Sequence, residues 1–98
     1  MTDESKRKLL DITEGAAMSL HPYDLCAGLQ LHWSGNWGLV CQKDVELNSA
    51  SLMSAGDRRT MSAFIDRKGV HFWIMTELDC GVTTVMVRED LAGWEVVS

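Results

Sequence analysis

The chain has 98 residues, of which 46% are hydrophobic and 23% charged, a composition typical of one small globular domain rather than of a disordered chain. Fourteen acidic residues against nine basic ones give a formal net charge of −5, which argues against nonspecific nucleic-acid binding because that requires a basic surface. Three widely spaced cysteines without a C-x-x-C pair argue against a disulfide framework and favour a reducing cytoplasm. No apolar run approaches 18 residues and the charged N-terminus has no apolar core, so we expect neither a membrane span nor a signal peptide.

The N-terminal third is predicted to be helical. A first short helix, capped by Asp3 or Ser5, is expected to run through Leu10. Thr13 is a better cap for a second helix, because Glu14 falls in the first turn and apolar residues follow. No repeat, low-complexity tract or linker interrupts the sequence, which predicts a single domain over residues 1–98 with a frayed start at residues 1–10.

Two further helices are predicted before the chain changes its periodicity. Pro22 suits the first turn of a helix over residues 23–33, and residues 34–36 supply its stop. A loop with apolar anchors follows at residues 37–41, and the apolar stripe of residues 43–53 predicts another helix.

From residue 60 onward, apolar residues alternate with a period of two, as in β-strands. Strands are predicted over residues 60–65, 70–77 and 82–87, and residues 66–69 and 78–81 form the turns between them. The strand over 70–77 carries large apolar groups on both faces, so we expect it to be central. Residues 90–93 are predicted to turn, and residues 94–97 are predicted either to add a short edge strand or to form an extended tail.

These elements predict an α+β fold, in which N-terminal helices pack on a three- to four-stranded antiparallel sheet arranged as a meander. One face of the sheet should carry the helices. The other face is expected to be partly exposed and available to a partner.

A set of short motifs is spread over residues 12–90. It comprises His32, the loop Gly35-Asn36-Trp37-Gly38, Asp44, Asn48, Arg59, Ser62, Phe64, Trp73-Ile74, Thr76-Glu77, Asp79, Thr83-Thr84-Val85 and Glu89. In these residues the chain resembles a family of small uncharacterised proteins of bacterial plasmids, phages and other mobile elements, which carry a Gly-Asp-Trp-Gly loop and a block similar to Trp-Ile-Ile-Thr-Glu-x-Asp-Arg-Ser-x-Thr-Thr-Val-Leu-Leu-Pro. The resemblance implies a mobile-element setting and a shared fold, and no activity.

Four positions depart from that pattern. Asn36 replaces the acid of the loop, Cys80-Gly81 replaces an Arg-Ser pair in the turn, and Arg88 stands where a proline is usual. The segment around residues 54–58 is also about two residues longer. Any function that the family's turn arginine carries is therefore absent from this chain.

No residue pattern indicates catalysis, a metal site or a cofactor. The three histidines and three cysteines lack ligand spacing. Cys80 lies beside Asp79, whose negative charge disfavours a nucleophilic thiolate. Glu77 and Asp79 are open to two interpretations, an acid–base or cation-binding pair and ordinary turn chemistry, of which the second is favoured.

The acidic C-terminal part favours a protein partner. Residues 76–98 hold five acidic residues and one basic residue, which would complement a basic surface on a target. Trp37 is either an anchor that holds its loop on the core or an exposed binding residue. The predicted partner-binding residues are Trp37, Glu77, Asp79, Glu89, Asp90, Trp94 and Glu95.

We therefore expect a non-enzymatic, cytoplasmic protein-binding factor from a mobile element in a bacterial host. Its expected role is to inhibit a host defence complex, as anti-CRISPR or anti-restriction proteins do, by covering a basic nucleic-acid-binding subunit. Neither direct nucleic-acid contact nor membrane contact is expected. The alternative is an accessory protein of a phage or plasmid that self-associates, for instance as a homodimer.

Overall fold

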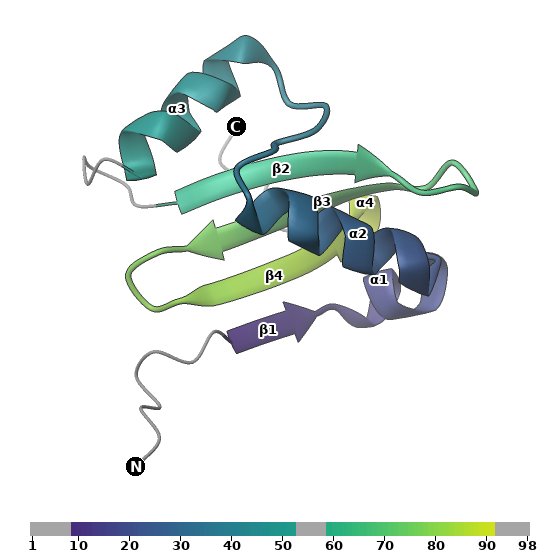
Figure 1. Cartoon of the computed structure of the whole chain (residues 1–98). Coiled ribbons are helices and arrows are strands. Elements are labelled where there is room, and N and C mark those ends of the chain that lie inside the picture. Colours follow the sequence, from purple (N-terminus) through teal and green to yellow (C-terminus); the bar gives the residue numbers. More distant parts are fainter. Residues whose placement is uncertain (1–8, 53–58, 92–98) are drawn as a thin grey trace.

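The computed structural model describes residues 9–52 and 59–91, which form one four-stranded mixed sheet with helices (Figure 1). The strands are β1 (Leu9–Ile12), β2 (Arg59–Ile65), β3 (His71–Glu77) and β4 (Val82–Val87), in the spatial order β1-β4-β3-β2. The helices are α1 (Glu14–Ser19), α2 (Pro22–Trp33), α3 (Gln42–Leu52) and α4 (Arg88–Leu91). None of these helices is long and apolar enough to cross a membrane. The predicted α+β class is confirmed.

The prediction of a purely antiparallel sheet with all helices before it is wrong in two places. The segment predicted to continue a helix through Leu10 is instead strand β1, which pairs in parallel with β4. Helix α4 follows β4, where residues 90–93 were expected to form a turn. A short helix would leave most of its terminal backbone groups unpaired, whereas pairing with β4 lets Leu9 donate to the Gly81 carbonyl at 3.1 Å and Thr13 to the Val85 carbonyl at 3.1 Å.

The C-terminal meander agrees with its prediction. Strands β2, β3 and β4 pair antiparallel in succession, and β3 is central. Gly69 and Gly81 supply the positive φ angles of the two turns, 87° and 71°. The predicted edge strand over residues 94–97 lies outside the described residues, as does the predicted end of the helix over residues 43–53.

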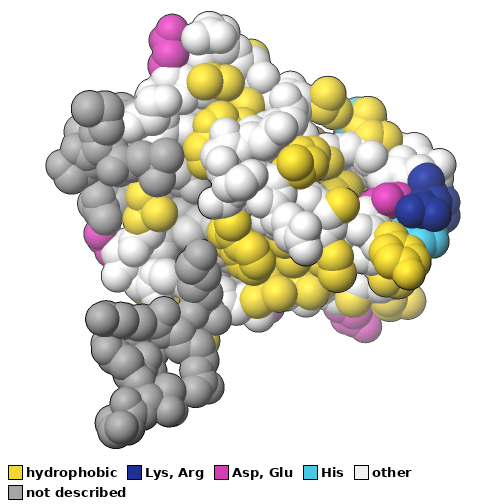
Figure 2. All heavy atoms as spheres, viewed as in Figure 1, with side chains coloured by type: hydrophobic (Ala, Val, Ile, Leu, Met, Phe, Trp, Pro, Cys, Tyr) yellow, Lys and Arg dark blue, Asp and Glu magenta, His cyan; other side chains and the backbone are white. Residues whose placement is uncertain are grey.

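Helices α1 and α2 cover one face of the sheet. Thr13 caps α1 by accepting from the Ala16 amide, and Pro22 opens α2, both as predicted. Their buried residues pack on alternate residues of β3 and β4, and the core cluster comprises Ala16, Leu20, Leu25, Leu29, Phe72, Ile74, Val85 and Val87. On the surface, hydrophobic side chains gather in the region between α2 and β1 (Figure 2).

The outer edge of β2 is covered by the segment that links α2 to α3 and by α3 itself. The Ala63 amide donates to the Trp37 carbonyl at 3.1 Å, and the Leu39 amide donates to the Ala63 carbonyl at 2.8 Å. The Asn48 side chain both accepts from the Met61 amide and donates to the Met61 carbonyl. The first of these bonds places the backbone of Trp37 against β2.

Candidate functional site

A pocket of about 430 Å³ opens where α2 ends and the sheet begins. Its walls come from the last turn of α2, the following loop, the turn between β3 and β4, and the three C-terminal strands. The lining residues are His32, Trp33, Ser34, Gly35, Trp37, Thr60, Thr76, Leu78, Gly81 and Thr83. Apart from His32, none of these side chains can carry a charge near neutral pH.

The floor of the pocket is a chain of hydrogen bonds centred on His32. Its Nδ1 lies 2.7 Å from the Ser62 hydroxyl, and its Nε2 lies 2.7 Å from the Thr76 hydroxyl. Thr76 in turn lies 2.8 Å from the Thr83 hydroxyl, which accepts from the Trp33 indole N–H at 3.2 Å. This chain joins α2 to β2, β3 and β4, because each strand contributes one hydroxyl.

Burial keeps His32 neutral. The residue is only 2% exposed, and this desolvation lowers the pKa of its imidazole from 6.5 to about 4. A neutral imidazole has one donor and one acceptor nitrogen, so the chain can run in either direction. When Nε2 accepts a hydrogen bond, the Thr76 hydroxyl donates its proton to that nitrogen. When Nε2 donates, the Thr76 hydroxyl can donate its proton to Thr83 or to a group in the pocket.

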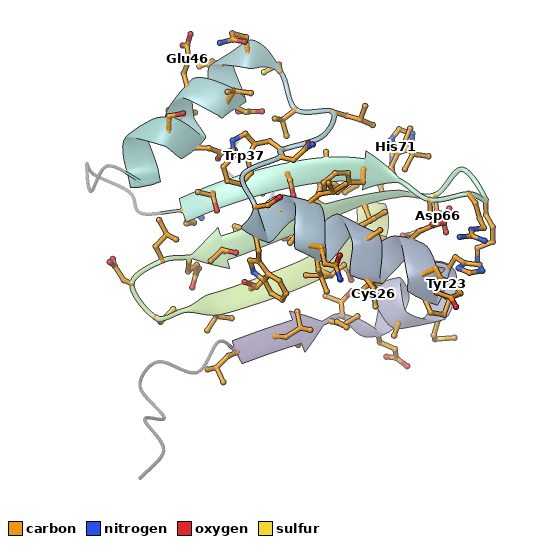
Figure 3. The ribbon with its side chains drawn as sticks, in the orientation of Figure 1. Tyr23, Cys26, Trp37, Glu46, Asp66 and His71 are labelled. Atoms are coloured by element: carbon orange, nitrogen blue, oxygen red, sulfur yellow. The ribbon has the colours of Figure 1, made fainter. Side chains whose placement is uncertain are left out.

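Two tryptophans flank this floor. Trp33, at the end of α2, is 41% exposed and reaches Thr83 on β4. Trp37 contacts the His32 ring edge-on, with centroids 5.5 Å apart and an angle of 76° between the planes. It lies beside the end of α2, where the chain passes over β2 (Figure 3). Trp37 therefore anchors its loop and also lines the pocket, so the two interpretations of this residue are compatible.

The contact between His32 and Ser62 resembles the pairing of a base with a nucleophile, but its geometry does not suit catalysis. Ser62 is fully buried, with 0% exposure, so a substrate could not reach its hydroxyl. An imidazole with a pKa of about 4 is also a weak base at neutral pH. Its Nε2 is already bonded to Thr76. The His32–Ser62 pair is therefore not arranged as a base and a nucleophile that a substrate can reach.

The acidic residues predicted to bind a partner do not lie together on one surface of the molecule. Glu77 ends β3 and is half-buried, and the Cys80 thiol lies 3.4 Å from its Oε1. Asp79 is exposed in the turn that follows. Glu89 is exposed on α4, beyond the opposite end of β4, which spans about 16 Å at the usual rise of a strand. The two acidic groups therefore lie at opposite ends of the sheet.

Asp90 has a structural role that the sequence did not suggest. Its Oδ2 accepts from the Thr13 hydroxyl at 2.6 Å and from the Val87 amide at 2.9 Å. The carboxylate thus ties the start of α1 to the end of β4. The remaining predicted partner-binding residues, Trp94 and Glu95, lie outside the described residues.

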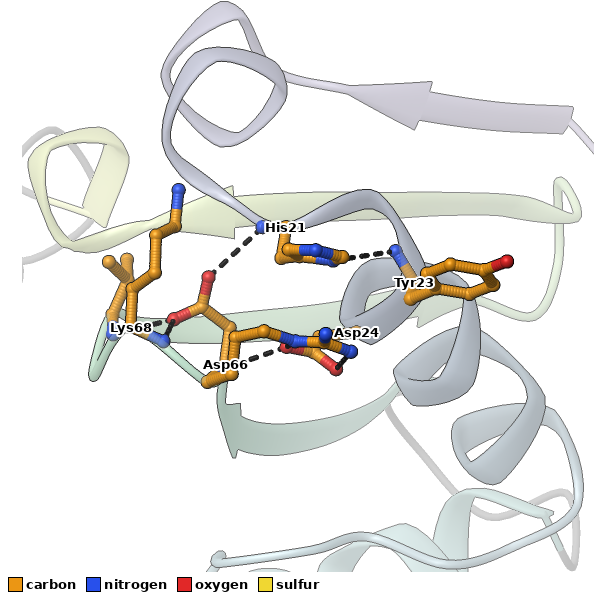
Figure 4. Close-up of polar contacts among 7 residues, drawn as sticks. His21, Tyr23, Asp24, Asp66 and Lys68 are labelled. Atoms are coloured by element: carbon orange, nitrogen blue, oxygen red, sulfur yellow. Dashed lines mark hydrogen bonds and ion pairs between the residues drawn. The ribbon is translucent and has the colours of Figure 1, made fainter.

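A second polar cluster holds the other end of α2 (Figure 4). Asp66, at the end of β2, accepts from the amides of His21, Lys68 and Val70. Burial alone would raise the pKa of Asp66, but these three amides lower it below its usual value. Arg67 forms a bidentate pair with Asp24, whose pKa falls to about 2 mainly because of the hydrogen bond from this guanidinium. Both oxygens of each carboxylate accept hydrogen bonds, so this cluster fixes the hairpin against α2.

Metal-binding groups are scattered over the part of the chain that the structure describes. No three of its histidine, cysteine, aspartate or glutamate side chains lie close enough to hold an ion. Cys26, Cys41 and Cys80 are free thiols and exposed. Cys26 lies at the side of α2 (Figure 3).

Sequence reasoning missed the pocket, although a signal for it was present. Ser62, Thr76 and Thr83 occupy positions of the strands that face the helices, where Phe72, Ile74 and Val85 supply the apolar core. Hydroxyls on an otherwise apolar face require a polar partner. His32, at the end of the apolar stripe of α2, is that partner.

No protein-family model, curated protein or solved structure matches this chain.

Proposed function

We propose that the chain is a non-enzymatic protein-binding factor and that the pocket beside Trp33 and Trp37 is its main contact site. The observation that supports binding is the chemistry of the pocket, whose walls are aromatic and whose floor is already hydrogen-bonded. Partly exposed tryptophans beside a buried polar floor are typical of binding hot spots. A weakly basic His32 and a buried Ser62 support binding over catalysis.

We further propose that the bound partner is a host defence complex, of the kind that anti-CRISPR and anti-restriction proteins inhibit. This part rests on the resemblance of residues 12–90 to proteins of mobile elements and on the net charge of −5. The mechanism is steric, because the chain would cover a basic nucleic-acid-binding subunit of the target. Glu77, Asp79 and Glu89, at the two ends of β4, would contribute long-range attraction rather than a continuous acidic interface.

The first test is affinity capture with the full chain from a bacterial lysate that contains CRISPR and restriction systems. Trp33→Ala removes one wall of the pocket, and Tyr23→Ala is the matched control. Tyr23 is also an exposed aromatic residue of α2, about 15 Å from Trp33 along the helix axis. We expect the native chain and Tyr23→Ala to retain the same defence subunit and Trp33→Ala to lose most of it.

Inhibition must then be shown with the purified complex. The native chain should block DNA cleavage by the captured nuclease, and Trp33→Ala should block it at least tenfold less well. Equal capture by Trp33→Ala and Tyr23→Ala would exclude the pocket as the contact site. Retention of no defence subunit by any of the three proteins would reject the inhibitor role.

An alternative is a self-associating accessory protein, and β1 favours it. This four-residue strand lies at one edge of the sheet, and within the described residues it pairs only with β4. Leu9 and Leu10 on it are about half exposed. An open edge can pair with a second copy. Light scattering of the purified chain at several concentrations would separate a defined dimer from a monomer.

A further inference from the structure

The lining of the pocket beside Trp33 and Trp37 favours an uncharged group. With His32 neutral, none of the lining side chains within residues 9–52 and 59–91 carries a charge at neutral pH. A charged group that left water for this site would meet no opposite charge among these side chains, which disfavours its binding. The occupant expected from electrostatics is therefore neutral.

The walls favour a flat ring. The indoles of Trp33 and Trp37 and the Leu78 side chain provide apolar contact, and aromatic rings pair with one another through stacked or edge-to-face arrangements. Gly35 and Gly81 at the rim leave open space, since a Cβ on either would meet nothing within 4 Å. The volume of about 430 Å³ falls within the usual range of ligand pockets and exceeds what one ring needs.

The floor favours a group that can both donate and accept a hydrogen bond. The hydroxyls of Thr76 and Thr83 keep one further lone pair each when the chain of bonds runs from Trp33 towards His32. In the opposite tautomer of His32, Thr76 can instead offer a proton. A phenol hydroxyl satisfies both states, whereas an indole N–H can only donate and a phenyl ring can do neither.

We infer that the pocket receives a tyrosine side chain of the protein partner, with its ring between Trp33 and Trp37 and its hydroxyl on Thr76. This inference rests on the proposed protein-binding function and specifies the residue that is recognised. Tyrosine combines the apolar body and the single polar tip that the pocket offers. An extended partner segment can place this side chain through the open rim while its backbone stays outside.

The test uses small analogues of side chains with the full chain. p-Cresol stands for the tyrosine side chain and toluene for phenylalanine, and binding is followed by NMR through the indole N–H signals of Trp33 and Trp37. We expect p-cresol to shift both signals and to bind about five- to tenfold more tightly than toluene, which is the effect of one net hydrogen bond.

Variants of Thr76 separate the hydroxyl from the shape of the pocket. Thr76→Val should abolish the preference for p-cresol and leave toluene binding within about twofold, which also shows that the pocket is intact. Thr76→Ser keeps the hydroxyl and should restore the preference. N-acetyl-tyrosinamide, which carries a peptide backbone, should bind as well as p-cresol if the source is a protein side chain.

Several results would overturn the inference. Equal affinity for p-cresol and toluene would show that the floor makes no contact, and unshifted Trp33 and Trp37 signals would show that the ring binds elsewhere. Failure of N-acetyl-tyrosinamide alone would point to a free phenolic ligand. Capture of a defence complex that depends on Trp33, without p-cresol binding, would reject the tyrosine and keep the proposed function. Binding of p-cresol without capture of any defence complex would keep the pocket's preference for a phenol and reject the inhibitor role.

Discussion

At the scale of single residues, His32 couples folding to pH. The pKa of its imidazole is about 4 in the folded chain against 6.5 when exposed, because burial disfavours the charged form. Between these two values the unfolded chain binds a proton that the folded chain does not. The free energy of unfolding must therefore decrease as the pH falls from 6.5 to 4 and stop decreasing from this cause below pH 4.

This coupling makes the free energy of unfolding depend measurably on pH. We expect the His32 contribution to lower the free energy of unfolding by up to about 3 kcal/mol across that window, measured by urea denaturation at several pH values. His32→Gln should flatten the slope whatever its effect at pH 7. His71→Gln, on the opposite face of β3, is the matched histidine control and should keep the slope. If the free energy of unfolding depended equally on pH in both variants, groups other than His32 would be its cause.

Asp90 and Glu89 provide a second test, because they are adjacent acids with different surroundings. Asp90 accepts two hydrogen bonds, from Thr13 and Val87, whereas Glu89 is exposed. Asp90→Ala should destabilise the fold by about 1–3 kcal/mol, since it leaves both donors unpaired. Glu89→Ala should change the free energy of unfolding by less than about 0.5 kcal/mol. Similar losses in the two variants, measured by thermal or urea denaturation, would contradict the structural role of Asp90.

At the scale of elements, Asn48 protects the outer edge of β2. Its side-chain amide replaces the neighbouring strand at Met61 by accepting from the amide and donating to the carbonyl, at 2.9 and 2.8 Å. Asn48→Asp removes the donor and places a carboxylate against the carbonyl, so we expect a loss of about 2 kcal/mol or more in urea denaturation. Ser49→Ala, at the next and exposed position of α3, should be nearly neutral. A neutral Asn48→Asp would mean that the edge does not need this cover.

The elements that could be predicted from sequence carry local signals. Pro22 and the stop after Trp33 delimit α2, and Gly69 and Gly81 mark the turns of the meander. Strand β1 could not be predicted, because its four residues become a strand only by pairing with β4, about 70 positions later in the chain. The pocket was missed for the same reason. His32, Ser62, Thr76 and Thr83 come from four elements, and their side chains meet only through the register of the strands and the packing of α2 on the sheet.

At the scale of the whole molecule, the fold joins two parts of unequal strength. Strands β2 to β4 form an antiparallel meander between neighbours in sequence, with the buried core on β3 and β4. Strand β1 joins this meander from far along the chain, and its residues are mostly exposed. Its backbone bonds to β4 and the contact between Thr13 and Asp90 hold it in place. Opening β1 therefore exposes little apolar surface, whereas opening β3 disrupts the core.

This asymmetry predicts a gradient of local stability. In native-state hydrogen exchange, we expect the amides of Leu9 and Thr13 to be the least protected of those bonded to β4, and the amide of Ile74 in the central strand to exchange only through global unfolding. Asp90→Ala should speed exchange at Leu9 and Thr13 more than its effect on global stability explains, because it releases Thr13 directly. Equal protection of Leu9 and Ile74 would instead show that β1 opens only together with the whole sheet.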